Sequence, residues 1–322
     1  MHNRQKLSDL IYITVFLILT FCILTNSRLS LSYAFTGLEL WYRNMIPALM
    51  PFMILSGTLI RMGLTEGFTT LVYPFVRPLF RVSRNVCYVM IMGFMCGFPM
   101  GAKCVADLYE RGKLSRDEGA YLLAFCNNIG PVYFVSFALP LIGCEQIAPC
   151  LFGMYGIPLL YGLVLRYTRY RKLSASPEPS ASPEAIDAPL SVKSPAASAS
   201  SQKLLGALDG SIRNSLQSML MLGGYMVLFN LLMLLPHLLL GQTPQRIAPL
   251  LEITGGLKLL GNRLPLYSLI VLPFGGFSCI AQTYTCIGHT DLSIGDYVLH
   301  KLMLTALTAG YYLLCLRFRL LR

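Results

Sequence analysis

The sequence predicts an all-α integral membrane protein, and two observations carry that prediction. Of the 322 residues, 55% are hydrophobic and only 13% are charged, whereas soluble domains carry about 25% charged residues. Residues 10–25, 121–142 and 216–240 are almost free of charge, and a bilayer-spanning helix needs about 20 such residues. We therefore expect the lipid bilayer to surround most of the chain.

Basic residues lie where helices would leave the membrane. The net charge is +11, and by the positive-inside rule clusters of Lys and Arg beside apolar runs mark cytoplasmic ends. The flanking basic residues are Arg4, Lys6, Arg77, Arg81, Arg84, Arg166, Arg169, Arg171, Lys172, Arg317, Arg319 and Arg322. No basic face with interleaved aromatic residues occurs, so we do not expect nucleic acid as a partner.

The ten cysteines and four histidines predict neither a metal site nor a cofactor. Most of the cysteines lie within apolar runs, no CxxC pair occurs, and the histidines are scattered. Cys144 and Cys150 flank a short loop outside the cytoplasm, and whether they pair stays open because spacing alone sets no geometry. HExxH, P-loop and GxSxG motifs are absent, so we do not expect an enzyme.

The chain divides at a segment rich in Ser, Ala and Pro. Residues 173–203 cannot bury a core, which predicts a disordered cytoplasmic linker. Before it come an N-terminal span and loop (1–40) and a first repeat with a connecting span (41–172). The apolar run 10–25 resembles a signal peptide but no cleavage site follows it, so we expect it to be retained as the first span. A second repeat (204–322) follows the linker.

Three landmarks recur in the same order on both sides of the linker, which predicts an internal repeat. The matched pairs are residues 43–44 with 213–214 (RN), 97–103 with 276–282 (GFPMGAK with GFSCIAQ), and 114–115 with 292–293 (LS).

Topology then predicts that the repeats are inverted. The expected spans are 10–25, 45–59, 121–139, 151–165, 216–234 and 297–316. Segment 87–99 is predicted to form half of a re-entrant hairpin from the cytoplasm, and segment 266–281 to enter from the outside and turn. The expectation is an inverted-repeat, transporter-like bundle with about six spans and two re-entrant hairpins, whose tips meet near the membrane midplane.

The first hairpin tip is the strongest candidate site. Gly97, Pro99 and Gly101 permit a break at membrane depth, and a helix restarting there directs free N–H groups inward. Lys103 adds a positive charge, and Asp107 follows one turn later. The tip either binds an anionic or carboxylate substrate or is held by a Lys–Asp ion pair.

Neutral polar groups complete the candidate substrate site. Ser278 and Gln282 follow Gly276 at the second tip and suit one end of a small polar ligand, or serve as interhelical contacts. Asn127 and Asn128 precede a Gly-Pro break. One amide can face a site while the other satisfies freed backbone, or both can cap the break.

Glu252 and Asp107 are the candidates for coupling to a gradient. Glu252 lies in an apolar segment before a glycine pair. It either takes up a proton or cation or caps a short helix at the outer surface. The coupling ion stays open.

Residues 97–134, GFPMGAKCVADLYERGKLSRDEGAYLLAFCNNIGPVYF, resemble the YlbJ-type sporulation integral membrane proteins, which carry nucleoside-recognition (Gate) domains. The second half fits more loosely, at residues 252–254 and 275–278 with Gln282. The resemblance covers most of 40–165 and 210–318, and the long linker departs from the family pattern. It implies movement of dipicolinic acid, a small aromatic dicarboxylate, across the outer forespore membrane, with Lys103, Asn127 and Asn128 at matching positions.

We therefore expect a transporter of a small anionic substrate, with dipicolinate first, working by alternating access at a midplane site between the hairpins. The alternatives are a nucleoside transporter, which the Gate domain name implies, and a non-transporting scaffold for spore or envelope assembly. The expected location is the bacterial inner membrane, or the outer forespore membrane if the organism sporulates, and a homo-oligomer is an open expectation.

Overall fold

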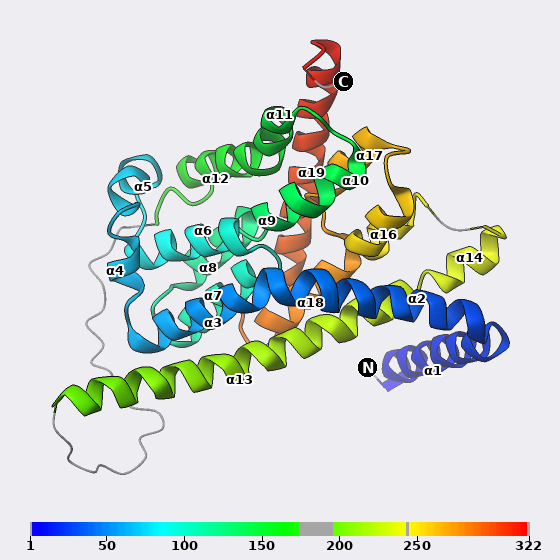
Figure 1. Cartoon of the computed structure of the whole chain (residues 1–322), viewed down its shortest axis with the longest axis horizontal. Helices are drawn as coiled ribbons and strands as arrows, with labels where there is room; N and C mark the ends of the chain where they lie inside the picture. Colours follow the sequence, from blue (N-terminus) through cyan, green and yellow to red (C-terminus); the bar gives the residue numbers. More distant parts are fainter. Residues whose placement is uncertain (1, 174–195, 243–244, 321–322) are drawn as a thin grey trace.

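The computed structural model describes residues 2–173, 196–242 and 245–320, and all regular structure in these ranges is helical (Figure 1). Before residue 174 the elements are α1 (His2–Thr25), α2 (Ser27–Leu40), the π-helical turn η1 (Trp41–Met45), α3 (Ile46–Met62), α4 (Thr65–Thr69), α5 (Tyr73–Phe80), α6 (Arg84–Cys96), α7 (Met100–Glu110), α8 (Arg116–Phe125), α9 (Pro131–Tyr133), η2 (Phe134–Ala138), α10 (Leu139–Ile142), α11 (Ile147–Leu151), η3 (Phe152–Gly156) and α12 (Ile157–Tyr167). After residue 195 they are α13 (Ala196–Leu231), α14 (Leu234–Leu240), α15 (Ala248–Leu251), α16 (Ile253–Leu260), α17 (Pro265–Val271), α18 (Gly276–Ile287) and α19 (Ile294–Arg317).

The chain is an all-α integral membrane protein. Within the described residues, five helical segments are long and apolar enough to cross a bilayer, or six if the sharply bent pair α5 and α6 forms one span. The five are Ser27–Met62, Ile147–Tyr167, Gln202–Leu240, Pro265–Ile287 and Ile294–Arg317.

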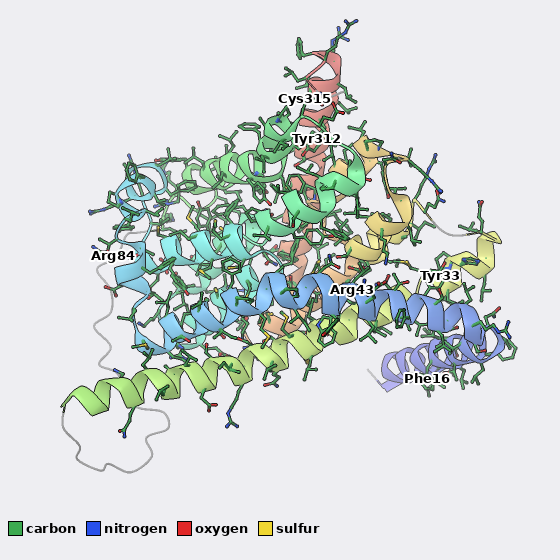
Figure 2. All side chains as sticks on the ribbon, viewed as in Figure 1. Phe16, Tyr33, Arg43, Arg84, Tyr312 and Cys315 are labelled. Carbon is green, nitrogen blue, oxygen red and sulfur yellow. The ribbon has the colours of Figure 1, made fainter. Side chains whose placement is uncertain are left out.

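Side chains on the outer surface suit contact with lipid. Phe16, Leu71 and Leu239 are 67%, 80% and 85% exposed, and such exposure of large apolar groups marks a face that lies against lipid or a partner. Tyr312, by contrast, is 1% exposed and packs inside the bundle from α19 (Figure 2).

The first span predicted at 10–25 lies in the separate helix α1, whereas the returning span predicted at 45–59 begins much earlier than residue 45. Helices α2, η1 and α3 run on as one 36-residue segment, Ser27–Met62, and α1 precedes it. The helix continues through a polar stretch whose side chains form hydrogen bonds and ion pairs. Ser30 and Thr36 donate to carbonyls one turn back (2.9 Å each), and Glu39 pairs with Arg43 and Lys258. The predicted boundary at residue 40 thus falls inside a continuous helix.

The predicted single span 121–139 is divided. Helix α8 ends at Phe125 and α9 begins at Pro131, with irregular backbone between them. Proline is tolerated at the first helical position but cannot continue a helix from the residues before it, which explains the break.

The first predicted hairpin tip is a turn between two packed helices. Helix α5 meets α6 at 105°, α6 ends at Cys96, and residues 97–99 lead into α7, which packs back on α6.

The second predicted hairpin, 266–281, does not fold back. Helices α17 and α18 form one 23-residue segment that is long enough to span. The break between them falls at Gly275 and Gly276, which both have positive φ (+78° and +80°). A glycine pair permits either a kink or a reversal, and the sequence does not distinguish them.

Elements that carry matched landmarks pack against each other. The turn η1, which holds residues 43–44, and the following α3 pack on α13, α7 packs on α18, and α8 packs on α19. Helices α2 and α3 run from right to left in Figure 1, whereas α13 runs from left to right. Ser115 and Ser293, the serines of the third landmark, both cap helices, accepting from the N–H groups of Glu118 and Asp296.

Most of the predicted linker lies outside the described residues. Its last residues, 196–203, are helical and form the start of α13. The predicted linker therefore extends too far at this end. Alanines 196, 197 and 199 favour a helix, and the last proline, Pro195, precedes them.

Candidate functional site

The first tip packs directly on the break after α8. Gly97 has a φ of +86°, and a Cβ there would lie 2.3 Å from the nitrogen of Gly130. A Cβ on Gly101 would lie 2.8 Å from the carbonyl oxygen of Cys126. Both glycines are therefore required for two irregular backbone segments to cross at close range, and Pro99 lies between them in the turn.

Asn127 joins the first tip to the second half of the chain. Its Oδ1 accepts from the N–H of Ala102 in the first turn of α7 (3.3 Å). Its Nδ2 donates to the hydroxyl oxygens of Thr283 on α18 (2.9 Å) and Tyr297 on α19 (3.1 Å). One amide thus contacts three elements and is 1% exposed.

Asn128 satisfies the broken backbone and holds a cation. Its Nδ2 donates to the carbonyl of Phe125 (2.6 Å), which the end of α8 leaves free. Its Oδ1 accepts from Nζ of Lys301 (3.0 Å). Asn127 therefore bridges three elements, and Asn128 caps the end of α8.

Lys301 on α19 lies at the centre of this arrangement. It is fully buried (0% exposed) and donates to the carbonyl oxygen of Asn127 as well as to Asn128. Its Nζ lies 4.6 Å from the ring centroid of Phe98 and 5.7 Å from that of Tyr297, within the range of cation–π contacts. No aspartate or glutamate in the described ranges forms an ion pair with it.

The two breaks meet at Phe98. A Cβ on Gly275 would lie 2.9 Å from the Phe98 ring, so the ring of the first tip rests on the glycine of the second. Beyond Gly276, Ser278 and Gln282 are buried, and the Gln282 amide donates to the Ser278 hydroxyl (2.9 Å).

The larger cavity lies beside the first tip, between α7, α13 and α18. It measures about 250 Å³. Lys103 and Asp107 line it from α7, Gln217 from α13, and Gln282 from α18. The Lys103 ammonium lies 3.5 Å from the Asp107 carboxylate, and both side chains are partly exposed (22% and 31%).

A second, smaller cavity of about 50 Å³ shares Gln282 and Leu222 with the larger one. Phe98, Glu252, Thr254 and Cys279 are among its lining residues. Gln282 therefore contributes to both cavities.

Glu252 caps α16 from inside the protein. Its carboxylate accepts from the backbone N–H groups of Thr254 (3.0 Å) and Gly255, and from the amide of Asn230 (3.1 Å). It is 2% exposed, so the cap is buried and does not lie at the outer surface.

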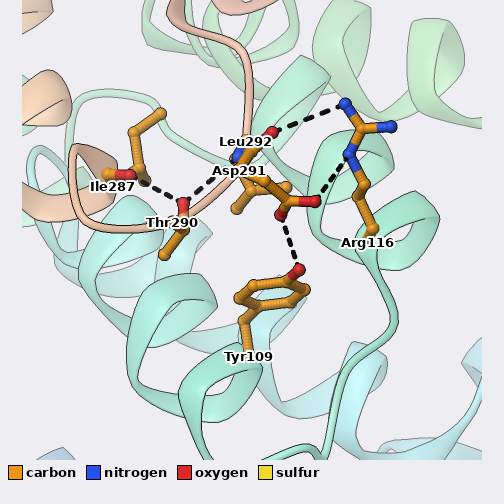
Figure 3. Close-up of polar contacts among 6 residues, drawn as sticks. All are labelled: Tyr109, Arg116, Ile287, Thr290, Asp291 and Leu292. Atoms are coloured by element: carbon orange, nitrogen blue, oxygen red, sulfur yellow. Dashed lines mark hydrogen bonds and ion pairs between the residues drawn. The ribbon is translucent and has the colours of Figure 1, made fainter.

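A polar cluster joins the loops that follow α7 and α18 (Figure 3). Asp291 accepts from the Tyr109 hydroxyl (2.5 Å) and pairs with Arg116 (3.1 Å). The hydrogen bond to Asp291 raises the pKa of the Tyr109 phenol, because it favours the protonated form. His289, which also lines the larger cavity, lies 2.5 Å from Glu110.

The candidate residues thus fall into three neighbouring groups. Lys103, Asp107 and Gln282 line the larger cavity, and Glu252 lines the smaller one with Gln282. Asn127 and Asn128 line neither but hold Lys301.

Lys301 was missed in the sequence. The signal was present, because it is a charged residue within the expected span 297–316, and intramembrane charges are candidates for function by default.

Comparison with known proteins finds a similar integral membrane protein. It is 28% identical to the sporulation integral membrane protein YlbJ of Bacillus subtilis (strain 168) over 341 aligned residues, which cover 97% of this chain and 84% of that protein. The chain is similar to this YlbJ protein over nearly its whole length. The alignment extends through both halves and agrees with the resemblance at residues 97–134. No protein-family model matches the chain, and no solved structure matches it.

Proposed function

We propose that this protein is a membrane transporter of a small carboxylate, with dipicolinate as the first candidate. The observation that carries the proposal is the position of Lys103. Its ammonium projects into a cavity of about 250 Å³ between the two halves of the chain, close to the start of α7. The lysine favours a carboxylate, and it rather than the helix end would bind one, because the N–H groups of Ala102 and Lys103 already have acceptors.

The size and lining of the cavity suit a small aromatic acid. An apolar cavity of about 150 Å³ takes up benzene, so this one has room for a ring with small substituents. Asn214 and Gln217 of α13 and Gln282 of α18 surround the Lys103–Asp107 pair with neutral amide donors. A carboxylate would meet one cation and several amides there.

Transport by alternating access needs two halves that part on either side of the site. The larger cavity lies where α7 meets α18 and α13, and the cluster around Asp291 joins the adjoining loops. We propose that this cluster closes one entrance, and that the inverted repeats rock around the site. In this proposal the substrate crosses the membrane without any covalent change.

Glu252 and Asp107 remain the proposed coupling groups. Glu252 already accepts three hydrogen bonds, so uptake of a proton there would weaken the cap of α16. Protonation of Asp107 would release Lys103 for substrate. We place the protein in the bacterial inner membrane, or the outer forespore membrane of a sporulating host.

The test is uptake of radiolabelled dipicolinate into proteoliposomes, beside uridine. Lys103→Gln removes the charge and keeps a polar side chain. Lys113→Gln, an exposed lysine just beyond α7, is the matched control. We expect uptake by the wild type and the control and loss in Lys103→Gln.

Each of the other outcomes supports a different function. Uridine uptake without dipicolinate uptake would support the nucleoside alternative. Uptake of neither by folded protein would contradict transport and support a scaffold.

A further inference from the structure

Helix α5 lies at one end of the bundle and exposes large apolar side chains there (Figure 1). Leu71, just before the helix, is 80% exposed, and Phe75 and Leu79 on it are 77% and 50% exposed. Phe80, by contrast, is 4% exposed and belongs to the core. Helix α5 therefore has one face packed on the bundle and a second apolar face that stays exposed in the described structure.

The basic side chains of α5 lie away from that exposed apolar face. Arg77 is two residues from both Phe75 and Leu79, which places it about 160° round the helix from each of them. The helix also meets α6 at 105°, so it lies across the direction in which α6 enters the bundle. A helix with apolar residues on one side and arginines on the other is typical of the membrane interface.

Two tyrosines position the arginines of this end of the bundle. The guanidinium carbons of Arg77 and Arg84 lie 5.9 Å and 5.3 Å from the ring centroid of Tyr73. The guanidinium carbon of Arg81 lies 5.5 Å from the ring centroid of Tyr167 on α12. The hydroxyl group of each tyrosine donates to a backbone carbonyl of α5 or of the residues just after it (3.1 Å and 2.8 Å), which fixes both rings. Cation–π contacts of this kind hold a guanidinium without using its N–H donors.

These three arginines lack a counter-charge in the described part of the chain. No aspartate or glutamate there forms an ion pair with them. Residues 67–106 contain no acidic residue, and Glu118, which accepts from Ser83 beside the cluster, also accepts from Ser115. Like charges one helical turn apart repel each other, so an anion from outside the chain would relieve the cluster.

We propose that α5 and the end of α12 form a binding site for the headgroup of an anionic phospholipid. The planar guanidinium of arginine donates two parallel N–H bonds to a phosphate, and Arg77, Arg81 and Arg84 supply three such groups. The exposed face at Phe75 contacts the acyl chains. That face favours a lipid over a free phosphate, because a soluble anion buries no apolar surface there.

The experiment measures how phosphatidylglycerol stabilises the purified full-length protein in detergent. Thermal unfolding is followed with increasing phosphatidylglycerol, phosphatidylcholine or inorganic phosphate. The variants are Arg77→Gln/Arg84→Gln and, as the matched control, Arg317→Gln/Arg319→Gln. The control removes the same two charges at the end of α19, where both arginines are exposed and neither contacts an aromatic ring in the described residues.

We expect phosphatidylglycerol to raise the Tm of the wild type, because a ligand that binds only the folded state stabilises it. Phosphatidylcholine and inorganic phosphate should leave the Tm unchanged. In Arg77→Gln/Arg84→Gln the concentration of phosphatidylglycerol that gives half of the shift should rise about tenfold or more, since each arginine adds to the attraction for an anionic headgroup. The control should stay close to the wild type.

Native mass spectrometry supplies a second readout, because it counts bound phosphatidylglycerol whatever the stability of the variant. The α5 variant should retain fewer lipids than the control. Equal retention and equal Tm shifts in the α5 variant and the wild type would refute the site. An equal loss in the control would show general attraction to basic residues, and stabilisation by phosphate alone would show a soluble ligand; either result overturns the proposal.

Discussion

Replacing Arg166 with lysine tests whether a single guanidinium fastens the end of α5 to the end of α12. Arg166 is 5% exposed, and each of its five N–H groups has a backbone carbonyl as acceptor. Nε donates to Phe80 (2.7 Å), Nη1 to Tyr170 (2.8 Å) and Arg171 (3.3 Å), and Nη2 to Arg81 (2.9 Å) and Leu173.

The magnitude follows from counting donors. A lysine ammonium has three N–H groups on one nitrogen, so at least two of the carbonyls lose their donor. A hydrogen bond to a charged group contributes about 1.5–3 kcal/mol, so two lost bonds cost about 3 kcal/mol or more. For a chain of this size that corresponds to a fall of about 4 °C or more in Tm.

The assay is thermal unfolding of purified Arg166→Lys in detergent, with Arg169→Lys as the matched control. Arg169 lies nearby, is half exposed, and makes one ion pair with Asp296 at 3.8 Å. Such a pair contributes at most about 1 kcal/mol, so the control should unfold close to the wild type. Equal Tm values for the two variants would refute the reasoning.

Two further predictions concern close packing. Gly93→Ala should destabilise the protein by about 1–3 kcal/mol in the same assay, because its Cβ would lie 2.1 Å from a backbone carbonyl of the break after α8. Gly67→Ala, with nothing within 4 Å, should leave stability unchanged or higher, and similar effects of both changes would contradict the packing argument. Cys144 and Cys150 have sulfur atoms 2.8 Å apart, so mild oxidation should join them. Peptide mass spectrometry would detect the loss of two hydrogen atoms, and two intact thiols after oxidation would show that the prediction is wrong.

Parts of the candidate site could be predicted from the local chemistry of the sequence. Gly130-Pro131 indicates a broken helix whatever the fold, because proline has no N–H to donate and restricts the residue before it. The Asn127-Asn128 pair beside it indicates a polar position at membrane depth. The structure shows that Asn127 bridges three elements and that Asn128 caps α8.

Other features depend on what lies across the bundle. Residues 26–40 look too polar for a span, yet they continue the helix, and α2 packs along α13 from the other half of the chain. Gly275 and Gly276 permit both a reversal and a kink. Packing of α17 against α19 and of α18 against α7 and α13 accompanies the kink.

The sequence by itself determined the membrane class, the spans at 151–165, 216–234 and 297–316, the break at Gly130-Pro131 and the lysine at the first tip. These follow from apolar run length, from proline and glycine backbone chemistry, and from the cost of a charge in lipid. Only the tertiary structure decided that Lys301, Asn127 and Phe98 form one buried cluster, separate from the cavity of Lys103. Lys301 contacts Asn127, 174 positions away, and also Phe98, and such pairings are set by how helices pack rather than by any local pattern.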